Sequence, residues 1–235
     1  MEFIEKYWHY VFFVCISLII FGSVQTTTLM HTDTPDIVDS YNTLTGPAYQ
    51  CHKGSKGKVC EVEFPQTLDE DANYKPLYGL LNGMTSNDTV YFHLSGDGGD
   101  FGVIAPTIHA IQSSKATTIA LVEGPVFSGH ADLAMSTKYI KISPNVMFLF
   151  HRVSMYGDRP LCELQHGKVD RTQDAEAKCY NFYDNYIIMD GRFSTQLLGN
   201  VLTQDQMAAL MAGHDIILQG DVVSHQLANS GRLIS

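Results

Sequence analysis

The sequence predicts an α/β fold in one domain, and two observations carry that prediction. The chain has 235 residues, 45% of them hydrophobic and 17% charged, which is the balance of a folded globule large enough for a layered core. Between residues 89 and 150, apolar runs of strand length alternate with stretches of helical spacing. This alternation is typical of parallel strands joined by right-handed crossovers, so we expect one sheet with interleaved helices.

Local spacing indicates the first strand and helix of this pattern. Residues 89–94 form a strand-like apolar run that ends in the loop 95–99, Ser-Gly-Asp-Gly-Gly. After the loop, Ile104, Ile108 and Ile111 recur at intervals of four and three residues, which places them on one face of a helix.

Further strands and one more helix follow. A second buried strand is expected over 117–122, ended by a sharp break at Gly124-Pro125, and residues 130–136 have a helical composition. Two more strands are expected over 139–142 and 146–150.

The C-terminal third is predicted to be mostly helical. A helix is expected over about 175–200, and the run 203–206, Thr-Gln-Asp-Gln, has the form of a capping box that opens another helix. A strand over 215–218 and a last helix from Asp221 to about Gly231 complete the domain.

The N-terminus forms a separate apolar segment. Residues 10–24 are uncharged, and this length suits a signal peptide or a short signal anchor, with a buried first helix of the domain as the alternative. We therefore divide the chain into a signal peptide or anchor (1–25), a linker and disulfide loop (26–60) and the α/β domain (61–235). The expected location is the periplasm or another extracytoplasmic compartment. Cleavage of the segment and its retention as a transmembrane anchor both stay open.

Cysteine usage is consistent with export. Apart from Cys15 in the apolar segment, the chain has four cysteines, and an even number in an exported protein indicates disulfide bonds. Of the three pairings that are allowed, we expect Cys51 with Cys60 and Cys162 with Cys179, because each closes a short loop. Zinc binding is the alternative, but the chain has no Cys-x-x-Cys spacing, so we expect no metal.

The charge balance restricts the partners. The formal net charge is −10, with 15 basic against 25 acidic side chains. A surface with so few lysines and arginines attracts neither nucleic acid nor anionic lipid, so we expect neither as an electrostatic partner. Long apolar runs occur only in the N-terminal segment, which excludes a protein with several membrane spans.

Three features with chemical potential lie at the ends of predicted strands. The glycines of loop 95–99 let main-chain N–H groups approach a substrate oxygen, although a tight turn is the simpler explanation. Ser128 lies between a strand and the first turn of a helix, where unpaired N–H groups favour an alkoxide; a simple N-cap is the alternative. His151 closes the strand 146–150 and is either a general base or a core histidine.

Together these features resemble the Clp protease proteolytic subunit and the wider Clp/crotonase-like superfamily. Residues 96–99, Gly-Asp-Gly-Gly, stand where that family has Ser-Pro-Gly-Gly, and residues 124–128, Gly-Pro-Val-Phe-Ser, where it has Gly-x-Ala-x-Ser. Pro144-Asn145, an apolar strand and His151 are similar to the family's approach to its catalytic histidine. The resemblance covers residues 90–156 well and the C-terminal region loosely, and it implies a Clp/crotonase-like spiral of βαβ units in a single domain.

The resemblance also implies roles for individual residues. Ser128 would be the nucleophile, His151 the general base, and the N–H groups of Gly99 and Gly129 the oxyanion hole. The family's catalytic triad also contains an aspartate that orients the histidine. Asp215 is the nearest carboxylate for this role, and a backbone carbonyl that orients the histidine is an alternative. Weaker carboxylate candidates are Asp184, Asp190 and Asp205.

Several residues depart from the family's pattern. Asp97 replaces the proline of the glycine loop, Phe127 is bulkier than the usual residue before the serine, and Gly129-His130 replaces Met-Gly. None of these changes removes a catalytic atom. An insertion at 159–179 lies where the family carries the helix that joins its subunits. The insertion argues against the family's ring, and formation of a homo-oligomer stays open.

The resemblance implies an exported serine peptidase, a hydrolase that cleaves peptides or unfolded proteins through an acyl-enzyme without a cofactor. We expect no ATPase partner, because ATP is absent outside the cytoplasm. Two other hypotheses remain: a catalytically inactive Clp-like binding or assembly module, and an acyl-CoA enzyme of the crotonase type.

Overall fold

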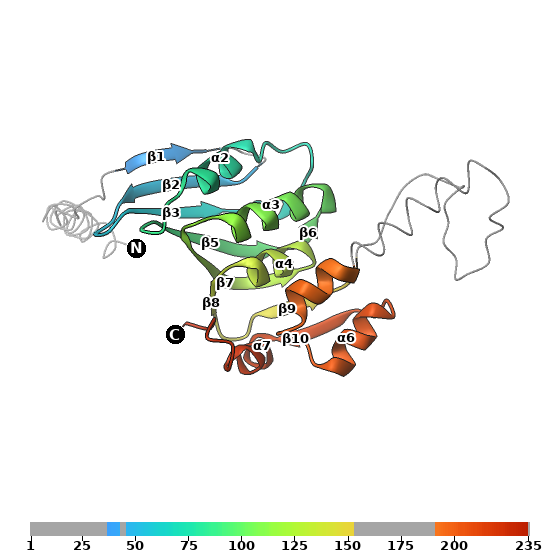
Figure 1. The fold of residues 1–235 in the computed structure, drawn as a ribbon. Helices are drawn as coiled ribbons and strands as arrows, with labels where there is room; N and C mark the ends of the chain where they lie inside the picture. Colours follow the sequence, from blue (N-terminus) through green and yellow to red (C-terminus); the bar gives the residue numbers. More distant parts are fainter. Residues whose placement is uncertain (1–36, 43–45, 153–190, 235) are drawn as a thin grey trace, which may run out of the picture. The chain divides into compact units, whose positions relative to one another are not determined.

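A mixed, largely parallel sheet with interleaved helices forms the core of the protein (Figure 1). The computed structural model describes residues 37–42, 46–152 and 191–234, which belong to one unit. The strand order is β1-β2-β3-β5-β7-β9-β10, with β8 also paired to β7. The strands are β1 (Ile37–Tyr41), β2 (Ala48–Lys53), β3 (Lys58–Glu63), β5 (Thr89–Gly96), β7 (Thr117–Phe127), β8 (Tyr139–Ile142), β9 (Met147–Phe150) and β10 (Ile216–Gln219). A separate pair joins β4 (Thr67–Leu68) to β6 (Gly98–Gly99).

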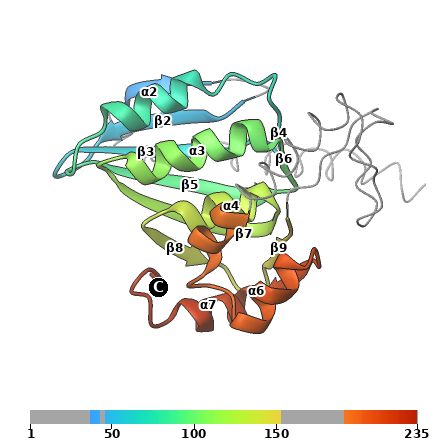
Figure 2. The same ribbon diagram turned by 45° about the vertical axis from the view of Figure 1, so that its right-hand side comes forward.

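The helices lie between the strands along the chain, as the alternating pattern predicted. They are α2 (Lys75–Gly83), α3 (Phe101–Ser113), α4 (Gly129–Ser136), α6 (Gln204–Met211) and α7 (Gly220–Leu227), and a further helical stretch covers 191–198. In both views α2, α3 and α4 cover the same face of the sheet (Figure 2). The predicted α/β class is therefore confirmed.

The parallel part of the sheet positions the ends of its strands at one edge. Strand β5 is parallel to β3 and β7, and β7 is parallel to both β8 and β9. On β5 the side chains of Val90, Phe92 and Leu94 are buried under the helices, while Tyr91 and His93 lie on the opposite, half-exposed face. Since the carboxyl ends of parallel strands point the same way, the segments after β5, β7 and β9 meet at that edge.

The break expected at Gly124-Pro125 is an irregularity within one continuous strand. Strand β7 runs through both residues to Phe127. Its register against β5 shifts where Leu94 pairs with Val122 but Gly96 pairs with Val126, so β7 holds extra residues there. Proline has no N–H to donate to the ladder, and a bulge accommodates it without ending the strand.

The described residues before 61 belong to the sheet. Strands β1 and β2 and the first half of β3 lie in the region assigned to a linker and disulfide loop, and the three strands form an antiparallel meander. The predicted Cys51–Cys60 disulfide is present, with an S–S distance of 2.04 Å. Its cysteines are a directly opposed pair of β2 and β3, and both are fully buried. The bond therefore joins two strands of the core.

Several predictions fall on residues outside the described ranges. These are the N-terminal apolar segment, the Cys162–Cys179 pair, the insertion 159–179, Asp184, Asp190 and the first part of the helix expected over 175–200. Within 37–42, 46–152 and 191–234, no helix has the length and apolar character to span a bilayer. The same residues hold no group of three histidine, cysteine, aspartate or glutamate side chains suited to a metal ion.

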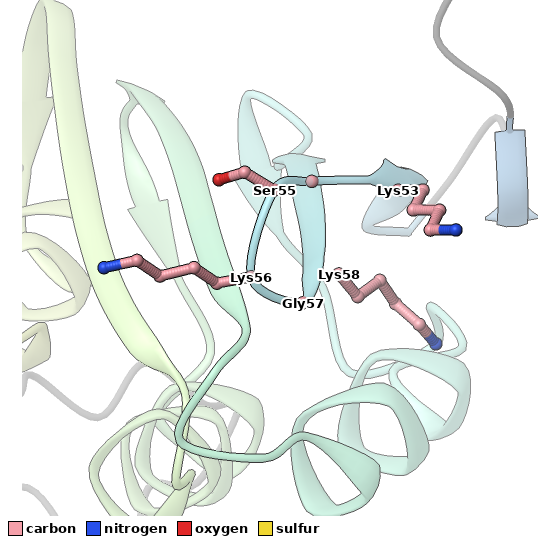
Figure 3. A pocket seen from close by; sticks show the side chains of 6 residues that line it. Lys53, Ser55, Lys56, Gly57 and Lys58 are labelled. Carbon is pink, nitrogen blue, oxygen red and sulfur yellow. The ribbon is translucent and has the colours of Figure 1, made fainter.

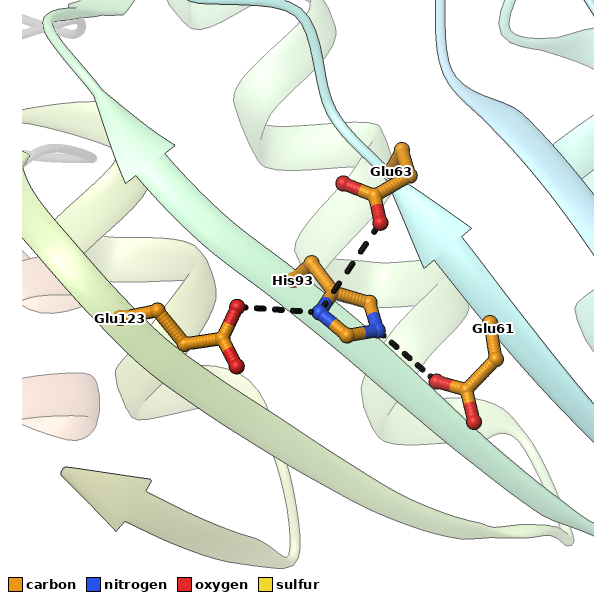
Figure 4. Close-up of polar contacts among 4 residues, drawn as sticks. All are labelled: Glu61, Glu63, His93 and Glu123. Carbon is orange, nitrogen blue, oxygen red and sulfur yellow. Dashed lines mark hydrogen bonds and ion pairs between the residues drawn. The ribbon is translucent and has the colours of Figure 1, made fainter. Parts of the chain in front are cut away.

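Three carboxylates surround one histidine on the sheet face opposite the helices (Figure 4). His93 Nε2 lies 2.9 Å from Glu61, and Nδ1 lies 3.2 Å from Glu123 and 3.9 Å from Glu63. The four side chains come from three neighbouring strands, β3, β5 and β7. Burial lowers the pKa of His93, but the hydrogen bonds to Glu61 and Glu123 and the nearby negative charges outweigh it and raise the pKa.

Replacing His93 with glutamine is expected to reduce the pH dependence of stability. Since the folded-state pKa of His93 is raised above 6.5, its contribution is complete below that pH and is lost as the pH rises through the folded-state value. The wild-type free energy of unfolding should therefore fall across this range, and that of His93→Gln should fall less. Urea unfolding from about pH 5.5 to about pH 9 measures the difference. The exposed His109 supplies a control, because His109→Gln should follow wild type; equal slopes for all three proteins would contradict the prediction.

Candidate active site

Ser128 occupies a strained turn between a strand and a helix. It follows the last residue of β7 and precedes Gly129, the first of α4, with φ of 52° and ψ of −124°. Among the described residues only Ser128 and Asn145 are non-glycines with positive φ. Such a conformation costs on the order of 1–3 kcal/mol. Its side chain makes no capping hydrogen bond to the helix, so Ser128 does not act as a conventional N-cap.

Hydrogen bonds on both sides hold Ser128 in this conformation. Its N–H donates to the carbonyl of Leu149 on β9 at 2.8 Å, and its carbonyl accepts from the N–H of Asp132 on α4 at 3.1 Å. The first bond continues the pairing of β7 with β9, and the second belongs to the first turn of the helix. The chain therefore changes from strand to helix at this one residue.

The glycine loop packs directly against Ser128. Gly98 has φ of +96° and Gly99 φ of +152°, a region that favours glycine. A Cβ atom on Gly98 would lie 2.6 Å from the Cβ of Ser128 and 2.9 Å from the amide nitrogen of Gly129. This close approach requires glycine at 98. It also brings the loop beside the N-terminus of α4, where helical N–H groups lack intrahelical partners.

His151 follows β9 at the same edge of the sheet as Ser128. Phe127 pairs with Leu149 in the parallel register. Ser128 follows Phe127 at the end of β7, and His151 follows Phe150 at the end of the neighbouring strand β9. The Nδ1 atom of His151 lies 2.7 Å from the carbonyl oxygen of Arg152. A carbonyl only accepts, so Nδ1 carries the hydrogen and the lone pair is on Nε2, as a general base requires. No hydrogen bond joins His151 to Ser128 among the described residues.

Asp215 directly precedes β10, as His151 directly follows β9, and it makes no described hydrogen bond to His151. Ile216, the first residue of β10, pairs with Phe150 in the antiparallel register, so Asp215 is the next position opposite His151. Asp215 is exposed. The described partner of the His151 ring is the Arg152 carbonyl. A backbone carbonyl in this role is the predicted alternative to an aspartate. Asp205 lies elsewhere, in the first turn of α6.

Sequence reasoning did not identify one residue that contacts the glycine loop. The ring of His130 is fully buried, and its Nδ1 accepts a hydrogen bond from the N–H of Gly98 at 3.0 Å. The two residues are 32 positions apart. In the sequence, His130 stands out only as a departure from the Clp family's pattern at the second position after the serine, because Gly98 and His130 come together only in the folded chain.

A concave feature lies at the β2–β3 turn (Figure 3). It is lined by the six consecutive residues 53–58, which include three lysines. The amino groups of Lys53 and Lys58 point to one side and that of Lys56 to the other, and Lys58 lies 3.8 Å from Asp39. Because the lysines do not converge, we assign no anion site to this turn.

Comparisons with known proteins leave the family open. The chain matches no protein-family model and no curated protein sequence. The interpretation of the site therefore depends on the geometry described above.

Proposed function

We propose that the chain is a serine peptidase with a Clp/crotonase-like fold, in which Ser128 is the nucleophile and His151 the general base. The observation that carries the proposal is the strained backbone of Ser128 at a strand-to-helix turn, together with a hydroxyl that makes no capping bond. A serine that only caps a helix has an extended backbone and bonds the helical N–H groups. Strain at a strand-to-helix serine is instead a feature of nucleophiles held at a sharp turn.

The surrounding groups support acyl-enzyme chemistry. Ser128 Oγ attacks the peptide carbonyl carbon and its proton passes to Nε2 of His151, while Gly99 and Gly129 N–H groups stabilise the resulting oxyanion. The C–N bond then breaks as His151 returns the proton to the leaving amine. Water hydrolyses the ester: His151 takes a proton from the water, and Ser128 regains its proton when the acid product leaves.

The tautomer of His151 favours a role as general base over that of a histidine that only packs in the core. Its Nδ1–H is held by the Arg152 carbonyl, and its ring is only partly buried. A base needs one nitrogen oriented and the other free to accept a proton. We propose that the carbonyl of Arg152 orients His151, and Asp215 remains the candidate for an acid that joins the site in the substrate complex.

The substrate class and location extend the same proposal. The N-terminal apolar segment and the cysteines support an exported protein that acts on short or unfolded peptides, either free in the periplasm or anchored to a membrane. No ATPase partner, nucleic acid or cofactor is part of the proposal.

Covalent labelling tests the nucleophile. A fluorophosphonate probe is expected to label the full-length wild-type protein at Ser128, because the reagent phosphonylates activated serines. The variant Ser128→Ala should lose the label, and Ser86→Ala, which changes an exposed serine of a turn, should keep it. Mass spectrometry of the labelled peptide identifies the site. Equal labelling of wild type and Ser128→Ala would contradict the assignment of Ser128 as the nucleophile, and no labelling of either protein would favour the catalytically inactive binding module.

A further inference from the structure

His130 makes two hydrogen bonds that specify one neutral form of its ring. Its Nδ1 accepts from the N–H of Gly98 at 3.0 Å, so this nitrogen carries the lone pair. Its Nε2 lies 3.1 Å from the carbonyl oxygen of Pro65, so it must carry the hydrogen. The ring is fully buried and therefore exchanges neither bond for water.

Close packing holds the His130 ring in place. A Cβ atom on Gly96 would lie 2.6 Å from Cε1 and 2.7 Å from Nε2 of the ring. The ring of Phe64 packs edge-on against it, with 6.4 Å between the ring centres. Burial lowers the pKa of His130 to about 4, against smaller opposing effects of the Pro65 carbonyl and Asp97. At neutral pH the ring is therefore uncharged, and Nδ1 stays an acceptor.

The bond from Gly98 links the glycine loop to the helix that follows Ser128. Two other hydrogen bonds, from Asp97 to Gln66 and from Asp100 to Leu68, hold the loop to the segment around β4. His130 lies on α4 next to Gly129. Its hydrogen bond to Gly98 therefore fixes the position of the loop relative to α4, the helix that begins directly after Ser128. Two glycines at positive φ have a wide choice of conformations, and a loop made of them needs external contacts to hold one.

We propose that His130 is a positioning residue that holds the Gly98–Gly99 loop against the start of α4, so that the N–H groups of Gly99 and Gly129 face the same substrate oxygen. This inference rests on the proposed function. The Gly98 N–H is already bonded to His130. The N–H of Gly99, the next amide of the loop, is therefore the one proposed to bind the oxyanion. Donors of an oxyanion hole act only when they are placed before the reaction begins.

Three substitutions at His130 separate positioning from packing. His130→Phe keeps a ring but has no acceptor for Gly98, and His130→Gln places its amide near the Nε2 position, away from Gly98. Both are expected to lower kcat for a fluorogenic peptide by about 100-fold, the effect of losing one oxyanion donor, with KM within about threefold of wild type. His130→Asn keeps an acceptor near the Nδ1 position and should recover kcat to within about tenfold of wild type. The exposed control His109→Gln should match wild type.

The outcomes distinguish this inference from the proposed function. A wild-type protein that takes no fluorophosphonate label and cleaves no peptide overturns both. A labelled, active wild type with unchanged kcat in His130→Phe and His130→Gln overturns the positioning role alone, and so does a rise in KM without loss of kcat. If His130→Phe does not fold, the comparison of His130→Gln with His130→Asn tests the positioning role, because both variants remove the ring but only His130→Asn keeps an acceptor for Gly98.

A spectroscopic measurement on the wild type checks the ring itself. In a ¹⁵N-resolved spectrum of the histidine side chains, one histidine should stay neutral with its hydrogen on Nε2 until the pH falls towards about 4. That signal should be missing in His130→Asn. A His130 that is charged near pH 6, or that carries its hydrogen on Nδ1, would overturn the proposal.

Discussion

Ser128→Ala is expected to lower kcat/KM for a fluorogenic peptide by about 10⁴-fold or more, while KM changes little. The reason is that the hydroxyl forms the covalent bond to the substrate, and no neighbouring group replaces it. The strained φ of 52° remains in the variant, so alanine removes one oxygen without removing a capping bond. Steady-state kinetics with purified full-length protein measure the loss, and Ser86→Ala serves as the control.

His151→Ala tests whether the serine and histidine act as one unit. Alone it should cost roughly as much activity as Ser128→Ala, and the double variant should be no worse than either single variant. Partners in one proton transfer show this lack of additivity, because each is ineffective without the other. Losses that multiply in the double variant, or full activity in His151→Ala, would contradict the assigned roles of Ser128 and His151.

Gly98→Ala is expected to lower kcat/KM by about 10²–10³-fold and to destabilise the fold. The new methyl group would lie 2.6 Å from Ser128 Cβ, 2.9 Å from Gly129 N and 2.9 Å from the Phe127 carbonyl oxygen. Two of these atoms belong to the backbone, which cannot move aside as a side chain end can. The loop must therefore shift away from the nucleophile, and φ of +96° adds strain of its own. Kinetics together with urea unfolding measure both effects.

Gly79→Ala is the matched control for Gly98→Ala. Gly79 lies inside α2, and a Cβ atom there would meet nothing within 4 Å. Alanine should leave activity unchanged and raise the free energy of unfolding by about 0.5–1 kcal/mol, because glycine is the poorer helix former. If Gly98→Ala kept wild-type activity, the loop would have no part in stabilising the oxyanion.

Local patterns in the sequence were sufficient for much of the fold. The isoleucines at 104, 108 and 111 are all buried on one side of α3, because helical spacing alone brings them together. The capping box at the start of α6 forms as predicted, with Thr203 and Gln206 exchanging side-chain and backbone hydrogen bonds. Strand β5 forms over the predicted run 89–94, and the burial of its side chains alternates along it. Each of these features depends on residues within about one turn or one strand of each other.

The arrangement of the candidate site depended on contacts between distant segments. His130 binds a carbonyl 65 positions away, and the carboxylates around His93 come from strands on either side of it. The register between β9 and β10 pairs Ile216 with Phe150, the residues next to Asp215 and His151 in the chain. A run of residues predicts that a strand exists, but its neighbours and register follow from how all the apolar faces pack at once. For this reason the identity of Ser128 and His151 as candidates came from local motifs, whereas the contacts of His130 and the orientation of His151 appeared only in the folded chain.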